Sequence, residues 1–170
     1  MSARRRLKST TCWHRGDVTS ARVVGLFTAA CAGVPVAPRA WVDVVPGVGI
    51  VGDRYATHHG HWSDPKWPDQ EVTLVETEVA AEVGIDAGQL RRNVVTCGIR
   101  LDEVIGARFQ IGDVVLVGVR RCDPCRYLES LLRPGLAQAL MGRGGLRARI
   151  IRGGRIHVGD GILVRSSPVQ

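Results

Sequence analysis

Glycine-containing turns divide this chain into many short segments, and they constrain its fold more than any other feature. Examples are Gly112-Asp113, Gly153-Gly154 and Gly159-Asp160-Gly161. Glycine loses more conformational freedom on folding than any other residue, so 21 glycines in 170 residues need a structural reason. Tight turns between short strands are the usual one.

The segments between these turns have the composition of β-strands. Some alternate polar and apolar residues, and others are short runs of Val, Ile and Leu. Short helices are expected at 76–83, and after Pro124 as far as residue 141. The pattern predicts a mainly β fold, most simply a β-barrel, with a few short helices. The expected strands are 22–27, 41–45, 71–75, 105–109, 114–119, 146–151, 155–158 and 162–164.

The length of 170 residues is enough for one domain with its own core. Residues 1–20 lack periodicity, so we expect a flexible basic N-terminal tail there and a single folded domain over 21–167. The tail holds Arg4-Arg5-Arg6 and Lys8, and no stripe of basic and aromatic residues follows it, so nucleic-acid binding is not expected. No apolar run is long enough to span a membrane, so no membrane partner is expected either.

The cysteines indicate the compartment. There are 5 of them, an odd number, at scattered positions. This arrangement is not typical of a disulfide framework, so we expect free thiols, a reducing environment and a cytoplasmic location. The positions are Cys12, Cys31, Cys97, Cys122 and Cys125.

Several polar groups could bind a ligand. The long loop at 46–70 contains Gly52-Asp53-Arg54 and three histidines, which exposed loops seldom use to bind a metal. Arg91-Arg92-Asn93 suits a phosphate or the edge of a pterin, since arginine offers a planar fork of donors. A solvated basic face is the alternative, and the same two interpretations apply to Arg147 and Arg149.

The pair Cys122-Asp123-Pro124-Cys125 has three interpretations. It could be half of a zinc site, a redox dithiol, or one reactive cysteine with an incidental neighbour. Cys125 opens the helix expected after Pro124, where free N–H groups and nearby arginines favour a thiolate. We therefore take Cys125 as the candidate catalytic and metal-binding residue, the alternative being that both cysteines are small buried residues.

The ordered set of motifs resembles the MOSC domain family, named for the C-terminal domain of molybdenum cofactor sulfurases. The likeness is to its small stand-alone bacterial members and extends over residues 22–165. It rests on Gly52-Asp53-Arg54 and on the segments 72–76, 90–99, 106–112, 122–125, 144–148 and 158–160.

The resemblance implies a β-barrel-like fold and assigns roles to particular residues. Cys125 matches the family's hallmark cysteine, which carries a persulfide in sulfurase-type members and ligates molybdenum in amidoxime-reducing members. In the latter a lysine and a serine follow the first strand, whereas this chain has Ala29 and Ala30. By match to the motifs, the residues around a molybdopterin cofactor would be Arg54, Arg91, Asn93, Thr96 and Asp160.

The resemblance thus implies a molybdenum-cofactor-dependent oxidoreductase that acts on N-hydroxylated small molecules. The chain has no flavin or iron–sulfur motif, so a separate electron-donor reductase would be its partner. Two alternatives stay open: a sulfur carrier with a persulfide on Cys125, supplied by a separate sulfur donor, and a domain that binds an anionic ligand or partner without catalysis.

Overall fold

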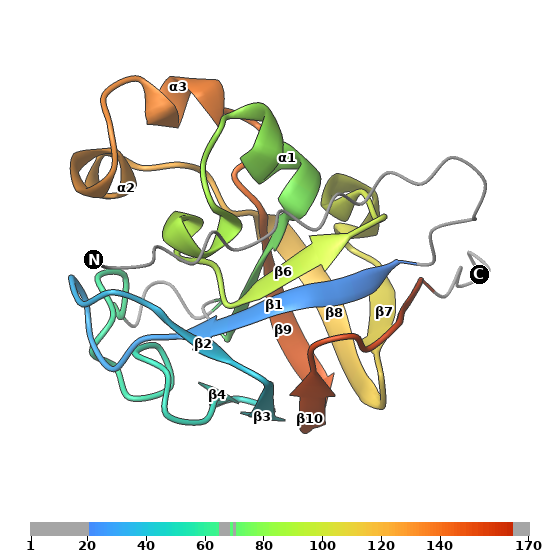
Figure 1. The fold of residues 1–170 in the computed structure, drawn as a ribbon. Coiled ribbons are helices and arrows are strands. Elements are labelled where there is room, and N and C mark those ends of the chain that lie inside the picture. The colour runs from blue at the N-terminus through green and yellow to red at the C-terminus, as the bar shows by residue number, and fades with distance from the viewer. Residues whose placement is uncertain (1–20, 65–68, 70, 165–170) are drawn as a thin grey trace, which may run out of the picture.

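A computed structural model describes residues 21–64, 69 and 71–164 of the chain. The tail expected at 1–20 and the expected end of the domain at 167 lie outside this part. The prediction of a mainly β fold is confirmed (Figure 1). The strands are β1 (Arg22–Thr28), β2 (Ala37–Arg39), β3 (Trp41–Val45), β4 (Gly49–Ile50), β5 (Val72–Glu76), β6 (Val94–Cys97), β7 (Arg108–Ile111), β8 (Val114–Arg121), β9 (Leu146–Arg152), β10 (Gly154–His157) and β11 (Ile162–Val164).

The helices are few and short, as expected. Those after Glu76 and Pro124 fall where the sequence predicts them. The α-helices are α1 (Thr77–Glu82), α2 (Arg126–Leu131) and α3 (Leu136–Ala139), and the 3₁₀ helices are η1 (Ala87–Leu90) and η2 (Leu101–Val104).

Eight strands form the main sheet, in the order β11-β7-β8-β9-β5-β6-β1-β2. All its pairs are antiparallel except β5 with β6. The main sheet does not close into a barrel. Among the described residues, the start of β1 (21–23) and the segment before β11 (159–162) share only three backbone hydrogen bonds: Val23 N to Asp160 O, Gly159 N to Val23 O and Ile162 N to Ala21 O. The prediction of a barrel is therefore not confirmed.

The larger part of the core lies on the inner face of this sheet. Side chains alternate between the two faces along a strand, so Val114 and Leu116 of β8 and Leu146 and Ala148 of β9 point inward and are fully buried. The three-stranded sheet β10-β3-β4 adds Val42, Val44, Ile50 and Ile156 to the same cluster. It lies at the lower end of the view in Figure 1.

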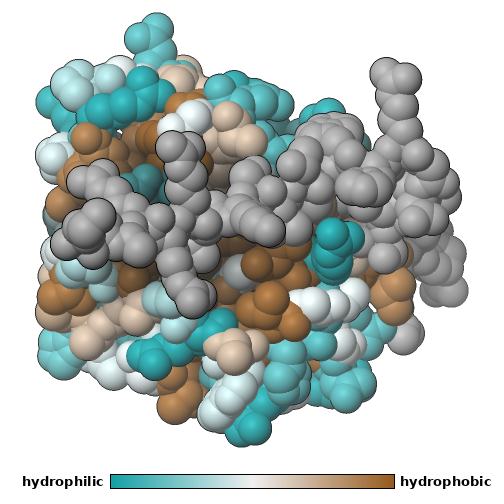
Figure 2. All heavy atoms as spheres, viewed as in Figure 1, coloured by the Kyte–Doolittle hydropathy of each residue, from teal (hydrophilic) through white to brown (hydrophobic). Residues whose placement is uncertain are grey.

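The helices cover the outer face at the centre of the sheet. Leu128 of α2 and Leu136 of α3 pack with Val75 of β5 and Val95 of β6 in a second buried cluster. Figure 1 shows α1, α2 and α3 together on this side. Within the described residues, no helix has the length and apolar character that crossing a membrane requires. On the face visible in Figure 2, hydrophobic and hydrophilic residues are mixed.

Candidate functional site

A row of polar side chains crosses the outer face of the main sheet. Thr73 of β5 is opposite Arg147 of β9, and Arg147 is opposite Arg120 of β8. Thr73 also bonds Asn93, which lies just before β6. The neighbours of Thr73 and Arg147 along their strands, Val72, Leu74, Leu146 and Ala148, point into the core, so Thr73 and Arg147 point away from it. We call Asn93, Thr73, Arg147 and Arg120 the polar row.

Asn93 joins three strands at one end of this row. Its Oδ1 accepts hydrogen bonds from the Thr73 backbone N at 3.2 Å and the Thr73 hydroxyl at 2.9 Å. Its Nδ2 donates to the Phe27 carbonyl of β1 at 3.2 Å. Since Asn93 is also buried, these bonds hold the ends of β1, β5 and β6 in register.

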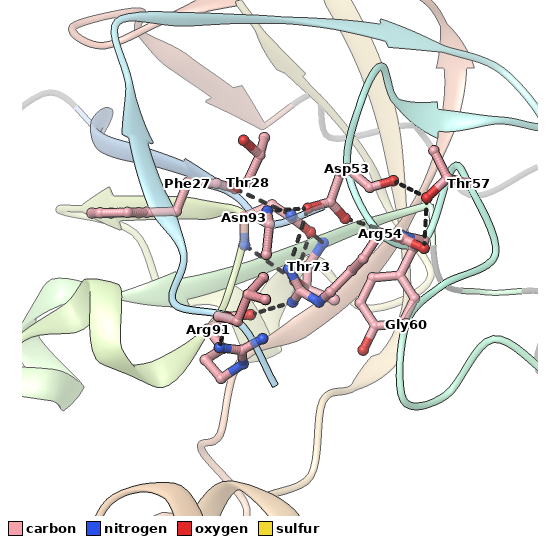
Figure 3. A network of polar contacts seen from close by, with 12 residues as sticks. Phe27, Thr28, Asp53, Arg54, Thr57, Gly60, Thr73, Arg91 and Asn93 are labelled. Carbon is pink, nitrogen blue, oxygen red and sulfur yellow. Dashed lines mark hydrogen bonds and ion pairs between the residues drawn. The ribbon is translucent and has the colours of Figure 1, made fainter. Parts of the chain in front are cut away.

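Asp53 and Arg54 form a buried ion pair beside Asn93 (Figure 3). Asp53 Oδ1 accepts from Arg54 Nη1 at 3.2 Å and from the Ala29 backbone N at 3.0 Å, and Oδ2 accepts from Tyr55 N at 3.3 Å. Arg54 Nη2 donates to the Arg91 carbonyl at 2.9 Å. The pair therefore fixes the long loop to the end of β1, the place at which the sequence has alanines.

Arg91 brings a second guanidinium to this group. Its backbone is left-handed, with φ of 59°, where it ends η1. Nη1 donates to the Val34 carbonyl at 2.6 Å, whereas Nη2 is buried without a hydrogen-bond partner. Burial lowers the pKa of the Arg91 guanidinium, and the positive charge of Arg54 lowers it further. Two close cations with one orphaned donor produce a local demand for an anion or an acceptor.

A cavity of about 340 Å³ opens beside Arg91, between η1, the loop after β1 and the end of α2. Phe27, Leu131 and Leu132 give it apolar walls. Most of its lining is apolar, and its polar groups are Arg91, Asp86 and Gln89; a mostly apolar pocket with a few polar groups is the usual character of a small-molecule site.

Arg92 and a glycine pair hold the cysteine motif against the sheet. Arg92 Nε donates to Gly144 O at 2.9 Å, and Nη2 donates to Cys122 O at 3.3 Å. Cys122 N donates to Gly145 O at 2.7 Å. A side chain at Gly145 would lie 2.1 Å from the Leu74 carbonyl oxygen, so the close approach requires glycine. Arg92 therefore has a structural role that the sequence does not indicate.

Cys125 directly precedes α2 and is a free, half-buried cysteine at the edge of the second hydrophobic cluster. Two residues further on, the Tyr127 ring stacks on His61 with 4.0 Å between centroids. This stacking places the start of α2 against the loop that carries Arg54. No group of three or more His, Cys, Asp or Glu side chains gathers as metal ligands in the described part of the chain.

The other cysteines differ from one another. Cys31 and Cys122 are free, and Cys122 is buried. Cys97 forms a disulfide. The expectation of free thiols is therefore wrong for Cys97, because a count of cysteines does not reveal which of them the fold brings together.

Thr96 and Asp160 lie apart from Arg54, Arg91 and Asn93. Thr96 is buried and opposite Val23, and its hydroxyl donates to the Val75 carbonyl at 3.3 Å. Asp160 accepts from His157 N at 2.8 Å, and its carbonyl accepts from Val23 N. Val23 is four residues before the Phe27 position that Asn93 contacts, or about 13 Å along the strand. The structure thus brings three of the five predicted cofactor residues together.

Arg147 is the residue whose importance the sequence left undecided. It is only 8% exposed, and its Nε and Nη1 have no hydrogen-bond partner. Its alternation with buried Leu146 and Ala148 placed it on the face opposite the core, but could not show that this face is covered there.

Comparison with known proteins gives a consistent result. The family model described as MOSC domain matches residues 58–163. The YuaD protein from Bacillus subtilis has a similar structure, with 23% identity, 87% of this chain and 97% of that chain covered, and a TM-score of 0.69. YiiM from Geobacillus stearothermophilus has 18% identity, coverage of 88% and 77%, and a TM-score of 0.66. YiiM from Escherichia coli has 17% identity, coverage of 88% and 72%, and a TM-score of 0.61. No curated protein matches the chain.

Proposed function

This chain belongs to the MOSC domain family, and on that premise we propose that it binds a molybdenum–pterin cofactor through the Cys125 thiolate and reduces N-hydroxylated small molecules. The observation that carries the proposal is a free, half-buried Cys125 on the helix-covered side of the sheet, where Arg91 and Arg147 hold buried nitrogens that have no hydrogen-bond partner among the described residues.

The residues present fit such a cofactor chemically. A soft thiolate is a suitable ligand for a molybdenum centre. The Arg91 Nη2 group is buried and unpartnered, and leaving such a donor unsatisfied is costly. A pterin edge or a phosphate would supply the acceptor, and the planar guanidinium suits both.

Each residue of the group has its own part in this proposal. Cys125 would ligate the metal, and Arg91 would donate to the anionic or acceptor edge of the cofactor. Arg54 holds Arg91 in place by donating to the Arg91 carbonyl. Asn93 holds the adjacent end of β1 by donating to the Phe27 carbonyl. The predicted contacts of Thr96 and Asp160 with the cofactor stay predictions, since both lie at the other end of the strands.

The chemistry divides between cofactor and protein. When bound, the molybdenum centre would supply the two-electron reduction, in which the N–O bond breaks, two electrons and two protons are taken up, an N–H bond forms and water is released. The chain's own residues bind and orient the substrate, for which the cavity beside Arg91 offers about 340 Å³ and apolar walls. The electrons come from a separate donor protein.

A sulfur-carrier function is the second candidate, because a free, half-buried Cys125 also meets the needs of persulfide chemistry. The two are distinguished by assaying protein from a cofactor-competent host with a chemical reductant and an N-hydroxylated amidine. A reductase consumes the amidine, and Cys125→Ser abolishes this while Cys122→Ala retains most of it. Wild-type protein with no reductase activity but with a reductant-labile sulfur on Cys125 would favour the carrier.

A further inference from the structure

Arg147 is a buried cation for which the described residues provide no counter-ion. It is 8% exposed, and Nε and Nη1 have no hydrogen-bond partner. Buried Arg54 provides the contrast, because its Nη1 donates to Asp53 and its Nη2 to a carbonyl. A charged group that has lost its water needs hydrogen bonds and a counter-charge in return, and Arg147 lacks both at these two nitrogens.

Two acidic groups near Arg147 in the described part of the chain, Asp69 and Glu71, already have partners. Asp69 pairs with Arg120, the neighbour of Arg147 in the polar row. Glu71 accepts a hydrogen bond from Ile150 N at 2.9 Å. On the other side of Arg147, the Thr73 hydroxyl donates its hydrogen bond to Asn93 Oδ1. The polar row thus contains an uncompensated positive charge between groups that cannot neutralise it.

This charge lies close to the cysteine motif. Arg147 is opposite Arg120 of β8, two residues before Cys122. Gly145, two residues before Arg147, accepts the hydrogen bond from Cys122 N. Because two residues of a chain span about 7 Å at most, a ligand on Arg147 lies near Cys122, the first cysteine of the motif.

We propose that Arg147 binds a phosphate-type oxyanion of a ligand that lies against the polar row beside the cysteine motif. The inference rests on the proposed function in one respect: it takes this ligand to be either the cofactor or the substrate of the proposed reaction. A tetrahedral oxyanion supplies the two things that Arg147 lacks, which are acceptors for its free N–H groups and a negative charge.

The first test is calorimetric titration of inorganic phosphate into protein from a cofactor-deficient host. Arg147→Met is expected to weaken phosphate binding at least about tenfold, the loss of one charge-assisted interaction, and Arg147→Lys to recover part of it. Arg149→Met removes the same charge from an exposed position of the same strand and is expected to change the affinity less than about threefold. In phosphate-free buffer Arg147→Met should melt at a higher temperature than wild type. Equal affinity in wild type and Arg147→Met, or no phosphate binding by wild type, would overturn the inference.

The second test identifies the source of the oxyanion, with the same variants made in a cofactor-competent host. Loss of pterin and metal from Arg147→Met assigns the site to the cofactor's phosphate. Full retention of both, together with weaker phosphate binding, assigns it to the substrate. If wild type holds no molybdenum while its phosphate affinity still depends on Arg147, the inference stands and the proposed function fails.

Discussion

Replacing Asp53 by alanine should strongly destabilise the protein, because this carboxylate organises the loop beside the candidate site. Asp53 is 2% exposed and accepts hydrogen bonds from Ala29 N, Tyr55 N and Arg54 Nη1. Its removal leaves Arg54, which is 4% exposed, with one hydrogen-bond acceptor among the described residues, the Arg91 carbonyl, and with the Tyr55 ring 4.7 Å away.

The magnitude follows from these contacts. Breaking one side of a buried ion pair costs about 3–5 kcal/mol, because the remaining charge stays buried without compensation. The two backbone N–H groups each add up to about 1 kcal/mol, less whatever water recovers as the loop relaxes. We therefore expect a loss of about 4 kcal/mol, a large part of the roughly 5–15 kcal/mol of a typical domain.

Urea unfolding followed by circular dichroism measures this loss. With a slope of roughly 2 kcal/mol per molar urea, the midpoint should fall by about 2 M. The double variant Asp53→Ala/Arg54→Met is the control, since it removes the stranded charge as well and should recover more than about 1 kcal/mol. A loss below about 1 kcal/mol for Asp53→Ala would refute the reasoning, as would a double variant less stable than the single one.

Two further predictions concern the glycine pair and the half-buried Glu76. Gly145→Ala should lower the free energy of unfolding by more than about 3 kcal/mol, because φ is +114° and the new Cβ would lie 2.1 Å from Leu74 O. Gly106→Ala, with φ of +78° and open space around the new Cβ, is the control and should lower it by only about 1 kcal/mol. Similar losses for the two variants in urea unfolding would contradict this account of the close approach. Burial raises the pKa of Glu76 in the folded state, which means that folding favours the protonated carboxyl. The contribution of Glu76 to stability is therefore full below the unfolded pKa of about 4.3 and is lost as pH rises through the raised folded pKa. Glu76→Gln should therefore stabilise the protein at pH 7 and have little effect near pH 4, and an equal effect at both pH values in urea titrations would show the assignment to be wrong.

Much of the fold could be predicted because its signals are local. Alternation and glycine turns located the hairpin of β7 and β8, the last strands and the helices after Glu76 and Pro124. The closure of the sheet could not be predicted in the same way, since it depends on whether residues 21–23 pair with residues 159–162 along a full strand. The parallel pairing of β5 with β6 likewise depends on distant packing.

The candidate site was predictable only in part, for a related reason. Arg54, Arg91 and Asn93 come together because the long loop binds the residue after β1 through Arg54 N and Ala29 O, and because Arg91 and Asn93 lie between η1 and β6. Thr96 and Asp160 belong to the same motifs but lie at the other end of the strands. Matching motifs gives an order along the chain and no distances. The importance of Arg147 could not be predicted, because its burial depends on what covers the outer face of the sheet.

The central claim is that the Cys125 thiolate holds a molybdenum–pterin cofactor. Its most direct test is the molybdenum and pterin content per chain of protein from a cofactor-competent host, with Cys125→Ser beside wild type. Cys31→Ser is the matched control, because Cys31 is also a free, half-buried cysteine. We predict near-stoichiometric metal and pterin in wild type and Cys31→Ser, and loss of the metal in Cys125→Ser. Equal metal content in wild type and Cys125→Ser, or none in any of the three, would contradict the claim.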